Sequence, residues 1–111
     1  MTLLEKTLVQ YIAWMQEMIT KLELYTKDIY DFDAFQSNPE KVDACLVPLI
    51  QIGEIAMHMQ RLYPDALELP YKDIIWFRVI LVHMYHKIDT KVIRNIIKNH
   101  IPKLKLLLQN T

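Results

Sequence analysis

Apolar residues recur along the first part of the chain at the spacing of an amphipathic helix. They step by four and three positions in alternation, which places them on one face of a helix. The members of this seam are Leu4, Leu8, Tyr11, Met15, Met18, Leu22 and Tyr25. Thr2 precedes the seam and Glu5 follows three residues later, which is the pattern of a capping box. The pattern therefore predicts a first long helix that begins at Thr2.

A second long helix is predicted to follow a short helical turn at residues 31–36. Asn38 is a good capping residue, and Pro39 suits the first turn of a helix. The expected inner face consists of Val42, Cys45, Leu46, Leu49, Gly53, Ala56 and Met57. Glycine costs a helix about 1 kcal/mol relative to alanine. Gly53 is the one glycine in the chain, and we expect it to mark a close approach of two helices.

Two further helices are predicted after the loop at residues 63–70. The third covers residues 71–86, and the fourth begins after a cap at Asp89 or Thr90 and is interrupted at Pro102. A single glycine argues against the turns that β-hairpins need. The 111 residues fit one domain, residues 1–111. The fold class predicted is all-α, a four-helix bundle with a short extra helix and antiparallel neighbours.

Composition limits the cellular setting and the kinds of site. The single cysteine, Cys45, excludes an internal disulfide and a cysteine-based zinc site. Glu5 interrupts any apolar run near the start of the sequence, and no uninterrupted apolar stretch approaches the ~18–20 residues of a membrane span. We therefore expect a cytoplasmic protein with no membrane contact.

Charge is unevenly distributed, although 13 basic and 13 acidic residues balance. Residues 71–111 contain eight Lys and Arg against two acidic residues, whereas the rest of the chain is acidic. Four of these basic residues step by four, three and four positions, from just before the fourth helix into it, and form a basic stripe: Lys87, Lys91, Arg94 and Lys98. A basic face of this kind suits a phosphate-bearing partner such as RNA. The alternative is an ordinary solvated helix face.

The third predicted helix carries polar groups within an almost continuous apolar run. Arg78, His83 and Tyr85 form an Arg-x4-His-x-Tyr pattern. At ~3.6 residues per turn, Tyr85 lies on nearly the same side as Arg78, and His83 lies well round from both. Three arrangements would bring Arg78 and His83 together: a helix break near His83, a long reach by the arginine, or a twofold partner that supplies a second copy.

These residue types suit cleavage of a phosphodiester without a metal. One histidine can take the proton of an RNA 2′-hydroxyl, and a second can give a proton to the leaving 5′-oxygen. Arginine offers a planar fork to the non-bridging oxygens. Because the 2′-hydroxyl is the attacking group, the substrate would be RNA, and the product would be a 2′,3′-cyclic phosphate.

Glu54 and His86 are candidates for supporting roles. Glu54 lies in an apolar stretch, and we expect it to pair with a basic residue such as Arg78. His86 lies three residues after His83 and shares its side of a helix. Together with His58 these side chains fall short of a di-iron ligand set, so we expect no metal site and no cofactor.

Several segments resemble the HepT-like branch of the HEPN superfamily over nearly the whole chain. They are residues 77–89 around Arg78 and His83, residues 50–56 around Gly53 and Glu54, residues 63–64, residues 74–76 and residues 101–104. The resemblance implies an α-helical bundle that dimerises, with Arg78 and His83 of both subunits lining a catalytic cleft. It also implies a ribonuclease toxin paired with a minimal nucleotidyltransferase antitoxin, MntA, that attaches AMP to Tyr85.

One position departs from the pattern of these nucleases. The residue after the motif arginine is commonly polar in HEPN nucleases, whereas here it is Val79. This difference favours an alternative function, a non-catalytic HEPN subunit that binds a nucleotidyltransferase and its nucleotide or nucleic acid. The intact set of Arg78, His83 and Tyr85 favours the ribonuclease.

Overall fold

The computed structural model describes residues 6–29, 31–83 and 89–110, with the side chain of Phe32 left aside. Within these residues every regular element is a helix, which confirms the predicted all-α class. The elements are α1 (Leu8–Thr26), α2 (Phe32–Gln36), α3 (Pro39–Leu62), α4 (Tyr71–His83), α5 (Thr90–Asn95), the π-helical turn η2 (Ile96–His100) and α6 (Ile101–Gln109).

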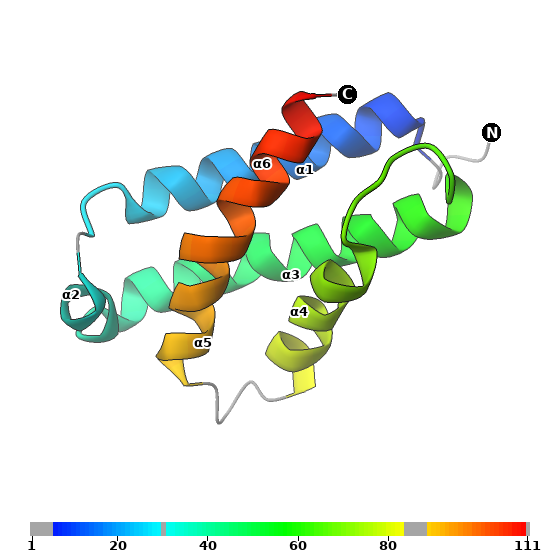
Figure 1. The fold of residues 1–111 in the computed structure, drawn as a ribbon. Helices are drawn as coiled ribbons and strands as arrows, with labels where there is room; N and C mark the ends of the chain where they lie inside the picture. Colours follow the sequence, from blue (N-terminus) through cyan, green and yellow to red (C-terminus); the bar gives the residue numbers. More distant parts are fainter. Residues whose placement is uncertain (1–5, 30, 84–88, 111) are drawn as a thin grey trace.

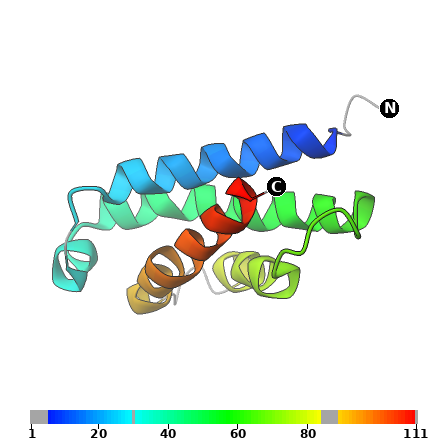
Figure 2. The same cartoon turned by 45° about the horizontal axis from the view of Figure 1, so that its top comes forward.

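α3 is the central helix of the bundle. It lies antiparallel to α1, and α4 packs against it (Figures 1 and 2). The α5–η2–α6 segment crosses the bundle, so that α5 contacts α2 and α3 while α6 contacts α1. By length and composition α3 is also long and apolar enough to cross a membrane, but most of that window is buried against other helices. Its apolar character is therefore that of a core helix.

α1 begins later than its predicted cap. Thr7, not Thr2, is the capping residue: its hydroxyl accepts from the Gln10 backbone N–H, and the Gln10 side chain accepts from the Thr7 backbone N–H. Residues 7–10 match the same capping-box pattern, and both halves of the box form there. Thr2 and Leu4 lie outside the described residues. The rest of the seam is confirmed, because four of its members are buried and two are half-buried.

The next two helices begin where the sequence predicted, and Asn38 is the expected cap of the second. Asp31 accepts from the Ala34 backbone N–H at the start of α2, and Asn38 accepts from the Lys41 backbone N–H at the start of α3. The predicted inner face of α3 is buried or close to it, with one error. Met57 is 39% exposed, because it lies at the edge of the face that contacts α1 and α4.

The segment after α4 is described only in part. The described portion of this helix ends at His83, and the expected continuation to residue 86 falls on residues outside the described ranges. Tyr85, His86 and Lys87 belong to that segment. Asp89 caps α5 as expected, since its carboxylate accepts from the Lys91 backbone N–H.

The predicted interruption at Pro102 takes the form of a π-helical turn. Proline has no backbone N–H and its ring clashes with the carbonyl four residues earlier, so a regular α-helix cannot continue through it. The preceding turn is wider, and the Ile101 N–H donates to the carbonyl of Ile96. The α5–η2–α6 segment therefore bends as it crosses the bundle (Figure 1).

Candidate functional site

Arg78 lies on the side of α4 that faces α3, opposite Gly53. A Cβ atom on residue 53 would overlap the Cβ of Arg78, and would lie 3.2 Å from the Ile74 carbonyl oxygen and 3.3 Å from the Arg78 Cα. The absence of a side chain at Gly53 thus allows α4 to approach α3 at this level. The expected close approach at the single glycine is confirmed.

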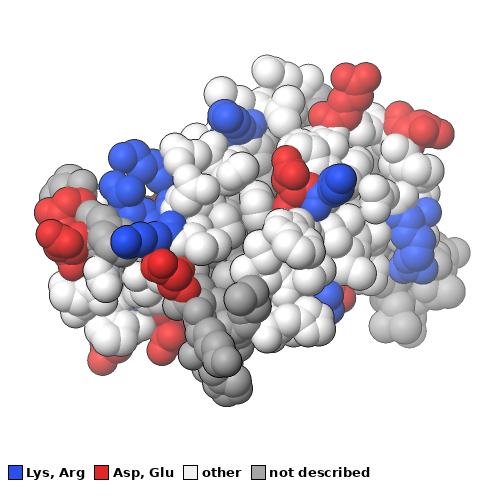
Figure 3. Space-filling view, turned by 60° about the horizontal axis from the view of Figure 1, so that its bottom comes forward, with Lys and Arg blue, Asp and Glu red and all other residues white. Residues whose placement is uncertain are grey.

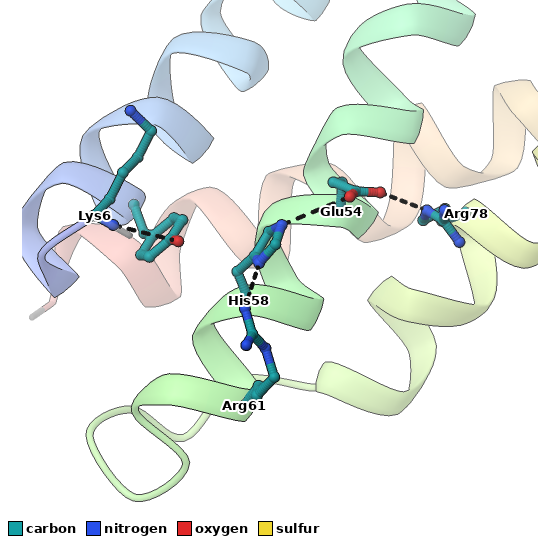
Figure 4. A network of polar contacts seen from close by, with 6 residues as sticks. Lys6, Glu54, His58, Arg61 and Arg78 are labelled. Atoms are coloured by element: carbon teal, nitrogen blue, oxygen red, sulfur yellow. Dashed lines mark hydrogen bonds and ion pairs between the residues drawn. The ribbon is translucent and has the colours of Figure 1, made fainter. Parts of the chain in front are cut away.

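Glu54 holds the Arg78 guanidinium. The Arg78 Nε–H donates to Glu54 Oε2 at 2.8 Å, across the interface between α3 and α4 (Figure 4). This contact confirms the expected pairing of the two side chains. Among the described residues, neither Nη nitrogen of Arg78 has a hydrogen-bond partner. The end of the guanidinium fork is therefore available to an anion such as a phosphate.

The polar network continues along α3 beyond Glu54. His58 Nε2 lies 3.6 Å from Glu54 Oε1, and Arg61 Nη2 lies 3.2 Å from His58 Nδ1. The imidazole stacks on the ring of Tyr11 from α1, with centroids 5.8 Å apart and planes 11° apart. Figure 4 shows these side chains as one chain of contacts running from Arg78 to Arg61.

The hydrogen bond from Arg61 determines which ring nitrogen of a neutral His58 carries the proton. Arginine has no acceptor, so the Arg61 guanidinium must donate to His58 Nδ1. A neutral His58 then carries its proton on Nε2, the nitrogen that faces Glu54. From the sequence, His58 is considered as a metal ligand, and this network is not predicted. A usable signal was present, because Glu54, His58 and Arg61 share one helix face at steps of four and three.

His83 is exposed at the end of the described part of α4. Five residues along a helix correspond to a rotation of about 140° and a rise of about 7.5 Å, so α4 directs Arg78 and His83 to different sides. His83 instead shares its side of the helix with Trp76 and Val79, by steps of three and four. The structure therefore does not bring Arg78 and His83 together within one chain.

The side of α4 that carries Trp76 exposes large apolar side chains next to charged ones. Trp76 is 57% exposed, and it forms a groove with the adjacent ends of α3 and α4. The residues that line this groove are Gln60, Lys72, Asp73, Ile75, Trp76 and Val79. Large exposed apolar side chains on one helix face are typical of a surface that binds another protein. Trp76 therefore does not belong to the core of this chain.

The basic stripe does not lie wholly on a solvated helix face, because part of it lines a pocket. Lys91 and Lys98 are exposed and Arg94 is half-buried, whereas Lys87 lies outside the described residues. Arg94 and Lys98 line a pocket of about 310 Å³, together with Thr26, Ile29, Asp31, Phe35, Ile97 and Pro102. Acidic groups lie among the basic ones on this part of the surface (Figure 3). The stripe thus runs into a pocket of mixed charge at the end of α1.

Two buried groups are perturbed by their surroundings without being part of these sites. Burial raises the pKa of the Cys45 thiol to about 11, against a smaller opposing effect of Lys41, so the thiol stays protonated near neutral pH. Burial also raises the pKa of Tyr71. Within residues 6–29, 31–83 and 89–110, no three His, Cys, Asp or Glu side chains are grouped so as to hold a metal ion.

Comparison with known proteins identifies relatives along most of the chain. Residues 15–111 match the family described as "Ribonuclease HepT-like". A Methanocaldococcus jannaschii protein named "Putative RNase" is 32% identical over 82 residues, which cover 73% of this chain and 74% of that protein. A Thermococcus cleftensis protein named "Probable ribonuclease HepT" is 29% identical over 99 residues, which cover 86% of each. No solved structure matches the chain significantly.

Proposed function

The chain belongs to the HepT-like ribonuclease family of the HEPN superfamily, and from this premise we propose that it is a homodimeric, metal-independent endoribonuclease toxin. The arrangement of α4 supports this proposal more than any other observation. Among the described residues, Arg78 is held by Glu54 with no partner at its Nη nitrogens, and His83 is exposed on the Trp76 side of the same helix.

The proposed reaction uses the 2′-hydroxyl of the substrate. His83 takes the hydroxyl proton, O2′ attacks the phosphorus, and the bond from phosphorus to the 5′-oxygen breaks. His83 of the partner subunit gives a proton to that leaving oxygen. The products are a 2′,3′-cyclic phosphate and a 5′-hydroxyl. The free end of the Arg78 fork stabilises the negative charge that develops on the non-bridging oxygens.

A second copy of the chain supplies what one copy lacks. The groove around Trp76 and Val79 lies on the side of α4 that also carries His83. A twofold partner seated on that side would bury Trp76 and bring the two copies of α4 together. By resemblance to the family, the composite cleft would then be lined by Arg78 and His83 of both copies.

RNA would reach this cleft along the basic stripe. Lys91, Arg94 and Lys98, continued by Lys87, would contact phosphates. The exposure of Lys91 and Lys98 supports this role. The pocket beside Arg94 also contains apolar side chains. One nucleotide of the substrate would therefore contact the protein there through apolar groups as well as through its phosphate.

Control of the toxin would depend on a partner enzyme. By resemblance, an MntA-like nucleotidyltransferase attaches AMP to Tyr85, and His86 supports the site from the same segment. The seven-residue spacing predicts Tyr85 on the Arg78 side, so the added phosphate would occupy the fork that RNA needs. Incubation with the cognate transferase and ATP should add AMP to Tyr85 and reduce cleavage, and Tyr85→Phe should escape this effect.

A second candidate function rests on Val79. This half-buried aliphatic side chain lines the groove next to Trp76, where HEPN nucleases commonly carry a polar group. A chain without that polar group would serve as a binding subunit for a nucleotidyltransferase.

RNA cleavage in the presence of EDTA distinguishes the two functions. The ribonuclease should cut RNA, leave 2′,3′-cyclic phosphate ends, and spare an oligonucleotide with 2′-deoxyribose at the cleavage position. His83→Ala should abolish the cut without unfolding the protein, because the side chain is exposed. Absence of cleavage by the unmodified dimer would favour the binding subunit.

A further inference from the structure

The contacts that run along α3 from Arg61 through His58 end at Glu54 Oε1, the carboxylate oxygen that does not accept from Arg78. Glu54 Oε2 accepts from Arg78 Nε, and Glu54 Oε1 faces His58 Nε2 at 3.6 Å. The two oxygens of the Glu54 carboxylate thus face side chains of two different helices, Arg78 of α4 and His58 of α3. The imidazole itself is fixed on two sides, by Arg61 at Nδ1 and by the stacked ring of Tyr11.

We propose that His58 is a positioning residue for RNA cleavage: it holds Glu54 Oε1 away from Arg78 and so keeps the Nη nitrogens of Arg78 open for the phosphate. This inference rests on the proposed ribonuclease function for its consequence in catalysis. The geometric part of it concerns only the side chains of α1, α3 and α4.

The physical reason is the usual geometry of arginine and carboxylate. Two parallel hydrogen bonds between the guanidinium fork and both carboxylate oxygens are the favoured arrangement. The terminal torsion of glutamate is broad, so Glu54 can turn into that arrangement when nothing holds Oε1. A carboxylate that captured an Nη nitrogen as well as Nε would compete with the substrate phosphate. The attraction of His58 for Oε1 opposes this capture.

Arg61 and Tyr11 support this arrangement by fixing the imidazole of His58. Arg61 keeps Nδ1 as the acceptor and thereby directs the Nε2 proton of a neutral His58 toward Glu54. Tyr11 holds the plane of the imidazole ring from the side of α1. The charged and titratable groups around His58 are therefore Glu54 and Arg61 on its own helix, Tyr11 from α1, and Arg78 from α4 through Glu54.

Two substitutions of His58 separate positioning from packing. His58→Phe keeps an aromatic ring against Tyr11 but cannot attract a carboxylate, whereas His58→Gln loses the ring and keeps a hydrogen-bond donor. If His58 positions Glu54, kcat/KM for RNA should fall about tenfold in His58→Phe and less in His58→Gln. A packing role predicts the opposite order. Equal activity of His58→Phe and the unmodified protein would also overturn the proposal.

A double substitution tests whether His58 acts through Glu54. In the Glu54→Gln background, His58→Phe should cause no further loss, because the group that it restrains has already been changed. If His58→Phe lowers kcat/KM by the same factor in both backgrounds, His58 acts independently of Glu54 and the proposal is wrong.

NMR of the arginine side chain tests the geometry without any RNA. In the unmodified protein and in His58→Gln, the Nη–H signals of Arg78, assigned by their loss in Arg78→Lys, should be averaged by rotation of the guanidinium. In His58→Phe, capture by both carboxylate oxygens should slow that rotation and resolve the signals. His100→Gln is the matched control, since His100 also contacts an aromatic ring, Phe77, outside the network. Identical Arg78 signals in His58→Phe and the unmodified protein would overturn the proposal. Resolved signals in a protein that cuts no RNA would instead contradict only the proposed ribonuclease function.

Discussion

Gly53 of α3 and Arg78 of α4 are in contact across the interface of the two helices, with no space for a side chain on residue 53. The next residue, Glu54, accepts the hydrogen bond of the same arginine. Two consecutive positions of α3 thus determine both how near Arg78 comes and which way its guanidinium turns. This pair of contacts is the structural basis of the proposed phosphate site.

Replacing Gly53 with alanine tests the close approach. Overpacking costs typically about 1–3 kcal/mol, and the gain in helix propensity returns about 1 kcal/mol. We therefore expect a net loss of free energy of unfolding, measured by urea denaturation, together with weaker RNA cleavage. Val47→Ala on the exposed side of the same helix is the control and should stay within about 0.5 kcal/mol. A Gly53→Ala protein that is more stable than the unmodified one would contradict the contact.

Glu54 should matter far more for cleavage than for stability. Its pair with Arg78 is partly exposed, and such pairs contribute about 0–1 kcal/mol. Glu23 forms a comparable exposed pair with Lys105 at 2.7 Å, which makes Glu23→Gln a matched control. Both substitutions should lower the free energy of unfolding by less than about 1 kcal/mol, and Glu54→Gln alone should reduce kcat/KM for RNA. Equal effects of the two on cleavage would show that Glu54 has no special role.

Cys45 should make stability depend on alkaline pH. Its folded-state pKa of about 11 lies above the ordinary value of 9.0, because burial disfavours the thiolate. The contribution to stability is therefore complete below pH 9 and is lost as the pH rises toward 11. Urea denaturation of the unmodified protein should show a steeper decline over this range than that of Cys45→Ala. Parallel declines would mean that the thiol ionises equally well in the folded protein.

Lys91 and Lys98 should determine part of the salt dependence of RNA binding. Each phosphate contact releases counterions, so removing two contacts lowers the slope of log K against log salt concentration by about 2. We expect this change for Lys91→Gln with Lys98→Gln. Lys6→Gln with Lys21→Gln, two exposed lysines on or near α1, should leave the slope unchanged. If both pairs change RNA affinity equally, the stripe has no particular part in binding.

The elements of the fold were predictable because local signals and burial agree. Asn38 caps α3 as predicted, and Asp89, one of the two residues expected to cap the helix after the break, caps α5. The start of α1 was not, since Thr2 and Thr7 both begin a capping-box pattern, and the structure shows that the box at Thr7 forms and starts α1.

The sequence predicted a close approach at Gly53 and the pairing of Glu54 with Arg78, but it did not predict the longer series of contacts that includes His58. The single glycine and the acid beside it indicated a close approach and a partner for Arg78, and both are observed. The stacking of Tyr11 on His58 joins residues 47 positions apart, a contact for which one sequence gives no signal. The pocket beside Lys98 likewise requires α1, α2 and η2 to meet.

The rate of RNA cleavage by Trp76→Asp tests most directly whether two copies of α4 form one site. Trp76 is largely exposed in the single chain, so the substitution should leave the fold intact, while a charge in place of the exposed indole should prevent pairing. Sedimentation should first establish that the variant is a monomer at a concentration where the unmodified protein is a dimer. The account predicts that this monomer, assayed in EDTA, loses nearly all RNA cleavage although Arg78 and His83 are both present. A folded monomer that cuts RNA as fast as the unmodified protein would contradict it.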